Sequence, residues 1–350
     1  MRKYLLLIAT AAIVASCAKT DSINEVNEVE IDFEKAYIDN VTKAIYKGPY
    51  TTDNFSRSGN TMGVFGWKNV TKDGNTSDDA IFTDEAVSHD GTNWSYSPKR
   101  YWDSNANHYK FFAYAPHSGD FTGTVAMATP VASAFSITGF TQSTTVAQQV
   151  DLLVDLESRK EDQTNKSTAA TKPKVGFAFN HILSNVNFKM GVSTALKGDN
   201  QSNPVAVQSV EVKGVYINGT YSYANSAWGW SSRTSTSPFA ATLKNNNTVV
   251  FASDELTATA ADVPGLVNML LIPGSVSGYT ITINYTIGTE AFEKTINLTD
   301  FKNGNNAADA SWAIATKYTY VLTIGPDPIE FDATSITDWG TGVTFTYEVK

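Results

Sequence analysis

Apolar and polar residues alternate in short segments that recur from one end of this chain to the other. The clearest case is the last segment, in which Val343, Phe345, Tyr347 and Val349 are separated by polar residues. A period of two residues places alternate side chains on opposite faces of a β-strand, whereas an amphipathic helix needs a period near 3.6. This pattern predicts an all-β chain, and the many aromatic residues and threonines favour strands as well.

Strand-like segments follow one another at short spacing in both halves, punctuated by glycine and proline. The segment 145–156 fits both helical spacing and an inner strand, of which we favour the strand, and 254–262 suggests a short helix. Many short strands in each half predict two antiparallel β-sandwich domains in tandem. The strand-like segments are 29–33, 62–67, 94–96, 109–115, 174–179, 182–190, 205–216, 221–223, 249–251, 267–272, 279–287, 292–298, 317–324 and 342–350.

The length of 350 residues is enough for about two domains. Because the stretch 197–204 lacks a continuous apolar face, we place a domain boundary near it. The expected organisation is a signal peptide at 1–16, a polar tether at 17–27, an N-terminal β-sandwich at 28–195 and a C-terminal β-sandwich at 196–350.

The N-terminus has the pattern of a secretion signal. Arg2 and Lys3 precede an apolar run at 4–14, which is too short to cross a hydrocarbon core of about 30 Å. Small residues stand directly before Cys17, an arrangement that resembles a bacterial lipobox. We expect Cys17 to carry the lipid that holds the protein at a membrane. The alternative is an ordinary signal peptide with an incidental buried thiol.

The charge and cysteine content restrict the partners and the cross-links. Acidic residues outnumber basic ones by 35 to 26, which gives a formal net charge of −9 and a surface that should repel nucleic acid. The chain has one cysteine, so a lipidated Cys17 leaves no thiol for a disulfide. Hydrophobic burial must therefore stabilise the fold.

No pattern of catalytic residues stands out. The sequence contains neither a Gly-x-Ser-x-Gly elbow nor a glycine-rich phosphate loop, and no histidine pair has the spacing of a metal hydrolase. We therefore expect no enzyme activity, no cofactor and no metal. The four histidines are His89, His108, His117 and His181.

One acidic stretch imitates the ligand spacing of a calcium loop. Asp73, Asn75, Ser77 and Asp79 lie two residues apart, and Asp84 follows at the twelfth position. The sixth position lacks the required glycine and the twelfth is not glutamate, so solvated turns are the preferred interpretation.

Two tryptophans, Trp228 and Trp230, share one face of an extended segment. Exposed indoles on one face could form a stacking platform for sugars. Aromatic filling of a sandwich core is the preferred interpretation.

The first and last strand-like segments have matching patterns. Val29, Ile31 and Phe33 alternate with acidic residues, so this strand should have an apolar inner face and an acidic outer face. The alternating segment at the C-terminus can complete the protein's own second sandwich or pair with another molecule. Composition alone favours neither arrangement.

The chain resembles the fimbrillin family, whose members are subunits of fimbriae on anaerobic Gram-negative bacteria. The resemblance runs almost end to end, and its specificity lies in the order and spacing of motifs that are individually loose. The motifs are the lipobox at Cys17 and the segments 41–44, 62–65, 94–102, 109–116, 151–153, 177–184, 270–273, 317–324 and 336–339.

The resemblance implies two transthyretin-like β-sandwiches, export as a lipoprotein to the outer membrane surface, and assembly with other fimbrial subunits. A surface protease removes the N-terminal strand, here Val29, Ile31 and Phe33, and leaves an open apolar groove. A strand from another subunit then fills the groove by donor-strand exchange. Such a head-to-tail contact does not close, so it propagates as a filament.

The sequence departs from the family at the cleavage point, which is usually an arginine. The matching position holds Lys43, and the next arginine is Arg57. Either a lysine-tolerant protease acts on a shaft subunit, or the subunit keeps its lipid and first strand as an anchor or tip. The alternating C-terminal strand favours a subunit that can also donate. A glycan-binding surface lipoprotein that uses Trp228 and Trp230 is the alternative from another class.

Overall fold

The computed structural model describes most of the two halves of the chain, and its fold is all-β. The prediction from the alternating pattern is confirmed, and most strand pairs are antiparallel. No helix in the part of the chain described is long and apolar enough to cross a membrane. The described residues are 29–34, 37–38, 52–103, 105–162, 174–193, 205–241, 243–244, 248–249, 259–303, 310–325, 335–338 and 342–346.

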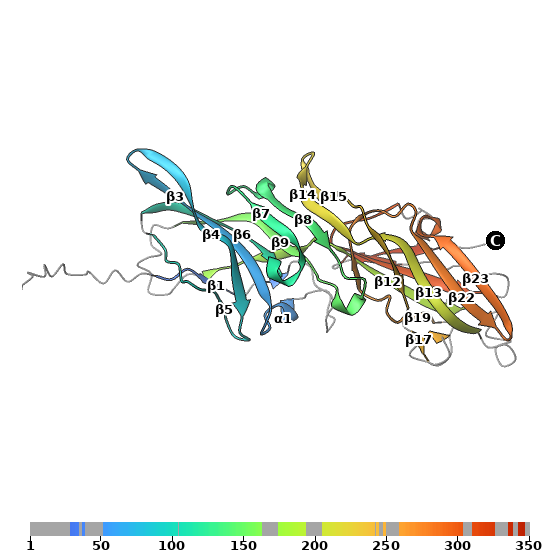
Figure 1. The fold of residues 1–350 in the computed structure, drawn as a ribbon. Coiled ribbons are helices and arrows are strands. Elements are labelled where there is room, and N and C mark those ends of the chain that lie inside the picture. Colours follow the sequence, from blue (N-terminus) through green and yellow to red (C-terminus); the bar gives the residue numbers. More distant parts are fainter. Residues whose placement is uncertain are drawn as a thin grey trace, which may run out of the picture.

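A seven-stranded sheet forms the centre of the N-terminal half (Figure 1). Its middle strands are apolar on both faces because both faces are covered, which explains consecutive apolar residues in the sequence. Gly63 illustrates the close packing, since a Cβ there would lie 2.1 Å from Cε1 of Tyr114 on the next strand. The order is β2 (Tyr37–Ile38), β11 (Ala178–His181), β9 (Leu153–Asp162), β6 (Ala106–Ala115), β3 (Thr61–Lys72), β4 (Asn75–His89) and β5 (Trp94–Ser95).

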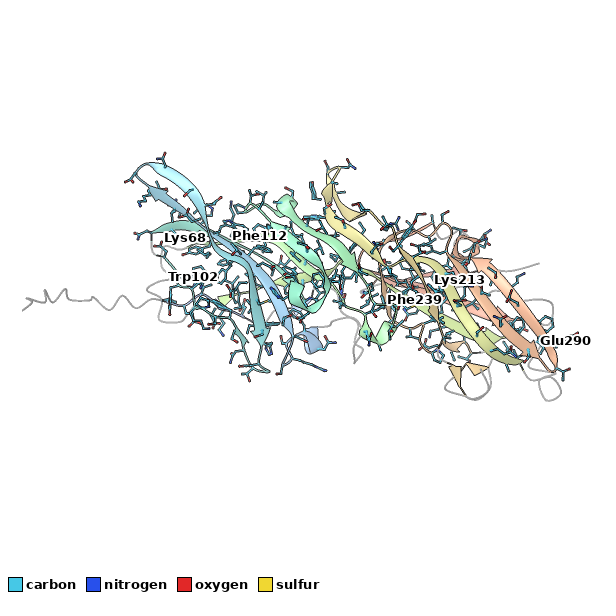
Figure 2. All side chains as sticks on the ribbon, viewed as in Figure 1. Lys68, Trp102, Phe112, Lys213, Phe239 and Glu290 are labelled. Carbon is cyan, nitrogen blue, oxygen red and sulfur yellow. The ribbon has the colours of Figure 1, made fainter. Side chains whose placement is uncertain are left out.

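Two hydrophobic clusters lie on the two faces of this sheet. Val64 and Phe111 belong to one cluster, and their chain neighbours Phe65 and Phe112 belong to the other, as expected from the two-residue period. Figure 2 shows the labelled Phe112 and Trp102 on opposite sides of the strands. The first face is covered by the short strands β1 (Asp32–Phe33) and β10 (Lys174–Val175) and by α1 (Thr52–Phe55).

The second face is covered by a four-stranded sheet. Its order is β15 (Ala227–Ser231), β14 (Asn218–Ala224), β8 (Phe135–Thr141) and β7 (Thr122–Met127). The remaining elements of this half are the 3₁₀ turns Ser118–Asp120, Ala132–Ala134 and Val146–Gln148.

The C-terminal half contains a second pair of packed sheets around one large cluster, which includes Phe188, Phe239 and Tyr320. One sheet has the order β16 (Thr236–Ala240), β13 (Val205–Tyr216), β22 (Thr280–Ile287) and β23 (Glu290–Asn297). The other has the order β19 (Ala261–Asp262), β12 (Ser184–Val192), β26 (Thr316–Ile324), β27 (Ser335–Asp338), β28 (Gly342–Thr346) and β24 (Lys302–Asn303), with β20 (Met269–Leu271) also paired to β12.

Short elements complete the half. The pair β17 (Leu243–Lys244) and β18 (Thr248–Val249) and the pair β21 (Gly274–Ser275) and β25 (Ser311–Trp312) form two-stranded sheets, and a 3₁₀ turn spans Leu298–Asp300.

Strand pairing links the two halves in both directions. β12 precedes the expected boundary at 195, yet it pairs in parallel with β26 from Asn185↔Lys317 to Val192↔Ile324. The hairpin β14–β15 follows that boundary, yet it pairs with β8. The division into domains 28–195 and 196–350 stays a prediction.

Local structure differs from the sequence-based expectation at three places. The acidic stretch that imitates a calcium loop begins at a hairpin turn and continues as β4, an extended strand in which residues two apart line up along one face and do not encircle a point. The expected helix at 254–262 is wrong at its end, since β19 is a strand, and 254–258 lie outside the described residues. The ambiguous segment 145–156 contains both a 3₁₀ turn and the start of β9.

Candidate functional site: residues 29–34 and the surface beneath them

Residues 29–34, called here the N-terminal segment, lie between two other pieces of chain. On one side, the Ile31 amide donates to the Arg100 carbonyl at 2.8 Å and the Trp102 amide donates to the Val29 carbonyl at 2.9 Å. On the other side, the Glu34 amide donates to the Val175 carbonyl at 3.1 Å, next to the parallel pair β1–β10. The segment is therefore hydrogen-bonded along both edges.

The inner face of the N-terminal segment is buried in the first hydrophobic cluster. Val29, Ile31 and Phe33 are 7%, 0% and 2% exposed, which agrees with the inward face expected from their spacing. The Phe33 ring lies within 5.5 to 5.9 Å of the rings of Tyr96, Phe82 and Phe177, measured between centroids. Each of these edge-to-face and stacked contacts adds to the free energy of burial.

Tyr96 holds the backbone of the segment from below. Its hydroxyl donates to the Ile31 carbonyl at 2.6 Å and accepts from the Arg100 amide at 3.2 Å. Burial raises the pKa of this hydroxyl to about 12, so the proton needed for donation is present at neutral pH. One buried side chain thus joins the N-terminal segment to the neighbouring backbone at Arg100.

The outer face of the segment is acidic and meets positive charges. Lys99 Nζ lies 2.6 Å from Glu30 Oε1, and Lys174 Nζ lies 3.1 Å from Asp32 Oδ2. The side chain of Glu34 lies over Gly176, where a Cβ would come 2.3 Å from Glu34 Oε1. We call Phe82, Tyr96, 99–102 and 174–177 together the acceptor surface.

The free energies that hold and oppose the segment are of similar size. Burial of one valine, one isoleucine and one phenylalanine contributes roughly 5 to 9 kcal/mol gross. Ordering six residues of backbone costs roughly 6 to 12 kcal/mol, and each new hydrogen bond returns about 1 kcal/mol. The free energy gained by burial and hydrogen bonding is thus comparable to the cost of ordering the segment.

The two cleavage candidates have different surroundings. Lys43 lies outside the described residues. Arg57 is exposed in a turn after α1, where its carbonyl accepts from the Asn60 amide at 3.1 Å. Phe55 is fully buried against Trp94 and Phe179, so a cut after Arg57 would place a further core residue on the released fragment.

The C-terminal strand pairs within the chain. β28 is antiparallel to β27, with Ile336↔Val343, and to β24, with Asn303↔Phe345. Sequence reasoning left pairing within and between molecules open, and the structure gives an arrangement within the molecule. Tyr347 and Val349 lie outside the described residues, as does Cys17.

Trp228 and Trp230 lie on β15 and are half-buried. The Trp228 ring stacks on Tyr221, with centroids 5.3 Å apart, and Trp230 Nε1 donates to the Ile182 carbonyl at 2.7 Å. Both pack against the second hydrophobic cluster. This geometry favours the core interpretation, and the sugar platform stays a prediction.

The buried titratable groups form a structural pair. His181 Nδ1 lies 2.9 Å from Asp151 Oδ2, and both side chains are almost fully buried. Burial lowers the pKa of His181, against the opposing effect of the Asp151 carboxylate, so the ring is neutral at neutral pH. Within the described ranges, no three His, Cys, Asp or Glu side chains come together in a way that could hold a metal ion.

Sequence reasoning did not identify Tyr96, Lys99 and Lys174 as residues that hold the N-terminal segment. Tyr96 and Lys99 lie in the segment 94–102, which contributed to the family resemblance without a role assigned to it, and Lys174 begins the strand-like segment 174–179. Charge complementarity with the acidic outer face could have pointed to lysines, but not to these particular ones.

Known proteins resemble this chain along most of its length. The chain is 25% identical over 372 aligned residues to a protein named fimbrium subunit Fim1C from Phocaeicola vulgatus, with 94% of this chain and 93% of that protein covered. The crystal structure of a fimbrial protein from Bacteroides vulgatus matches with a TM-score of 0.58 and 19% identity, over 91% of this chain and 99% of that one. The second likeness concerns the fold alone.

A family model described as fimbrillin-like matches residues 48–339. This match spans most of both halves, from just before α1 to just after β27. The chain therefore belongs to the fimbrillin-like family of fimbrial subunits.

Proposed function

We propose that this chain is a structural subunit of a surface fimbrium that supports adhesion and polymerises by donor-strand exchange. It is exported as a lipoprotein through Cys17, and a protease then removes the N-terminal segment. A strand of another subunit replaces the segment on the acceptor surface.

One observation carries this proposal: the inward side chains of the N-terminal segment are deeply buried, but few hydrogen bonds hold its backbone. Its three inward side chains are part of the core, while its backbone is held through a few hydrogen bonds at its edges. Removal uncovers apolar surface and takes away the Ile31 and Glu34 amides that donate to the Arg100 and Val175 carbonyls, and an incoming strand can replace these donors.

The C-terminal strand is the proposed donor, with Val343, Phe345, Tyr347 and Val349 as its anchors. Each of its ladders within the chain is short: two residue pairs with β24, three with β27 and one with β26. Release of a short ladder costs less than release of a long one, which favours a strand that can be given up. Of the two cleavage candidates, Lys43 is the better because Phe55 then remains in place.

A site-specific protease tests the proposal. A variant that carries a recognition sequence in residues 44–48 is cleaved, and polymer formation is followed by the appearance of SDS-resistant ladders. The control is the same variant without residues 342–350, which we expect to be cleaved but to form no ladder. Cleaved protein that stays monomeric in both forms would contradict the proposal.

Lipid attachment is tested separately in the bacterial host. Metabolic labelling with a fatty acid should mark the wild-type protein and leave Cys17→Ala unlabelled and released from the membrane fraction. Equal labelling of the two proteins would contradict attachment at Cys17.

A further inference from the structure

We propose that the acceptor surface selects its incoming strand by charge. Lys99 and Lys174 favour a strand of another subunit that carries carboxylates at the two outward positions now held by Glu30 and Asp32. This inference rests on the proposed function, because it names the chemistry of the strand that replaces the N-terminal segment.

The two lysines flank the segment at successive outward positions. Lys99 pairs with Glu30 and Lys174 pairs with Asp32, and the lysine side chains are 39% and 40% exposed. The pairs therefore lie at the rim of the acceptor surface, where a change of strand changes their partners. Lys99 is also fixed from below, since its Nζ lies 4.8 Å from the centre of the Tyr96 ring.

The third cation nearby has other partners. Arg100 Nη2 lies 3.7 Å from Glu85, and the same guanidinium donates to the carbonyls of Ile81 and Pro98. It is thus held by the chain's own groups on the side away from the segment. Lys99 and Lys174 are therefore the cations that select the incoming strand.

The backbone contacts to the segment do not depend on its sequence. The hydrogen bonds from or to Arg100, Trp102 and Val175 involve backbone groups that every non-proline strand carries. The Tyr96 hydroxyl binds a carbonyl oxygen, which is equally general. The inner face requires alternating apolar residues, so discrimination between apolar strands lies at the outward positions.

The chain's own last strand fits these outward positions poorly. When its apolar residues point inward, four other residues point outward, and only one of these, Glu348, has a carboxylate side chain. At most one of the two lysines can therefore face a carboxylate, whichever register or direction the strand takes. An acidic strand of another subunit supplies both. The four outward residues are Thr344, Thr346, Glu348 and Lys350.

The expected preference is moderate and depends on salt. An exposed ion pair changes an equilibrium by about 1.4- to 5-fold, so two pairs together give a preference of about 2- to 25-fold. Both lysines are partly exposed, so dissolved salt can screen their charges. The preference should therefore shrink as the ionic strength rises from about 0.02 M to about 0.5 M, where screening is strong.

The experiment uses the full chain with the protease site described above, cleaved in the presence of labelled peptides. The peptides are residues 28–35, residues 342–350, and residues 342–350 with Thr344→Glu and Thr346→Glu. We expect the first and third to bind more tightly than the second at low salt. The order should be reversed in the double variant Lys99→Glu, Lys174→Glu, because glutamates there repel the acidic peptides.

A matched control removes a lysine of similar exposure elsewhere. Lys189 is 41% exposed and lies 3.5 Å from Asp262 in the C-terminal half, so Lys189→Glu should leave the order of the three peptides unchanged. Should the double lysine variant fail to fold, the wild-type order at low and high salt decides the matter.

Two negative outcomes are distinguishable. Equal affinities for the three peptides at every salt concentration would overturn charge selection and leave strand exchange intact. Failure of all three peptides to bind, including residues 28–35, would overturn the proposed function itself.

Discussion

The Tyr96 hydroxyl donates a hydrogen bond of 2.6 Å to the backbone carbonyl of Ile31, 65 residues away in the sequence. This bond attaches a buried side chain of the folded body to the backbone of the N-terminal segment. Because its acceptor is a main-chain oxygen, the same tyrosine can serve any strand that takes the place of the segment.

Replacing Tyr96 by phenylalanine should loosen the N-terminal segment. The Ile31 carbonyl and the Arg100 amide lose a buried partner, which costs about 1 to 3 kcal/mol. Hydrogen exchange at the Ile31 amide should therefore be faster, by about 5- to 150-fold. The control is Tyr101→Phe, because Tyr101 is 46% exposed and the change there should have little effect. Equal exchange rates in the two variants would contradict this role of Tyr96.

Replacing Phe33 by alanine should weaken the hold on the segment more strongly. Truncation of a fully packed phenylalanine costs about 3 to 5 kcal/mol. The segment should then detach in the intact chain, which exposes residues 29–34 to proteolysis before the rest of the protein unfolds. Val131→Ala is the matched control, since Val131 is 50% exposed. Joint loss of the segment and the whole fold in one transition would argue against an exchangeable segment.

Two buried glutamines hold the halves of the chain together at one residue. Gln142 Nε2 donates to the Leu270 carbonyl at 3.0 Å, and Gln149 Oε1 accepts from the Leu270 amide at 2.7 Å. Gln142→Leu should leave several buried groups unpaired and lower the free energy of unfolding by about 2 to 4 kcal/mol. Urea denaturation measures the loss, with the exposed Gln148→Leu as control. A loss of stability in Gln142→Leu smaller than that in Gln148→Leu would contradict this role of Gln142.

The buried His181 predicts a loss of stability in acid. Because its pKa is lowered in the folded state, the unfolded chain binds a proton first as the pH falls below about 6.5. Stability should then decline by at most about 1.4 kcal/mol per pH unit from this group. His181→Gln should flatten the decline between pH 6.5 and 5.5. The measurement is urea denaturation at each pH, and an unchanged slope in His181→Gln would exclude His181 as the cause.

The sequence predicted the parts of the fold that depend on local pattern. Alternation identified the N-terminal segment and its inward residues Val29, Ile31 and Phe33, because burial of one face forces a period of two. It missed the outer part of the β3–β4 hairpin, since residues 75–80 of β4 are exposed on both faces and carry no apolar alternation. A strand without a buried face has no hydrophobic signal.

Pairing partners could not be predicted in the same way. β12 and β26 are separated by more than a hundred residues, and nothing in the sequence of either strand specifies a parallel partner. The contacts of Gln142 and Gln149 with Leu270 could not be predicted either, because polar groups of distant segments meet only once the sheets have formed. The sequence predicted an apolar groove beneath the segment. The positions of Lys99, Lys174 and Tyr96 around that groove follow only from the folded structure.

Strands of each half pair with strands of the other half, and this pairing affects how the molecule resists a pulling force. β12 belongs in sequence to the first half and in space to the second, and the β14–β15 hairpin has the reverse relation (Figure 1). Separating the halves therefore requires the β12–β26 and β14–β8 ladders to break together, whereas a flexible linker would only be stretched. Tension along an extended appendage would be carried through each link by hydrogen-bonded strands loaded in shear.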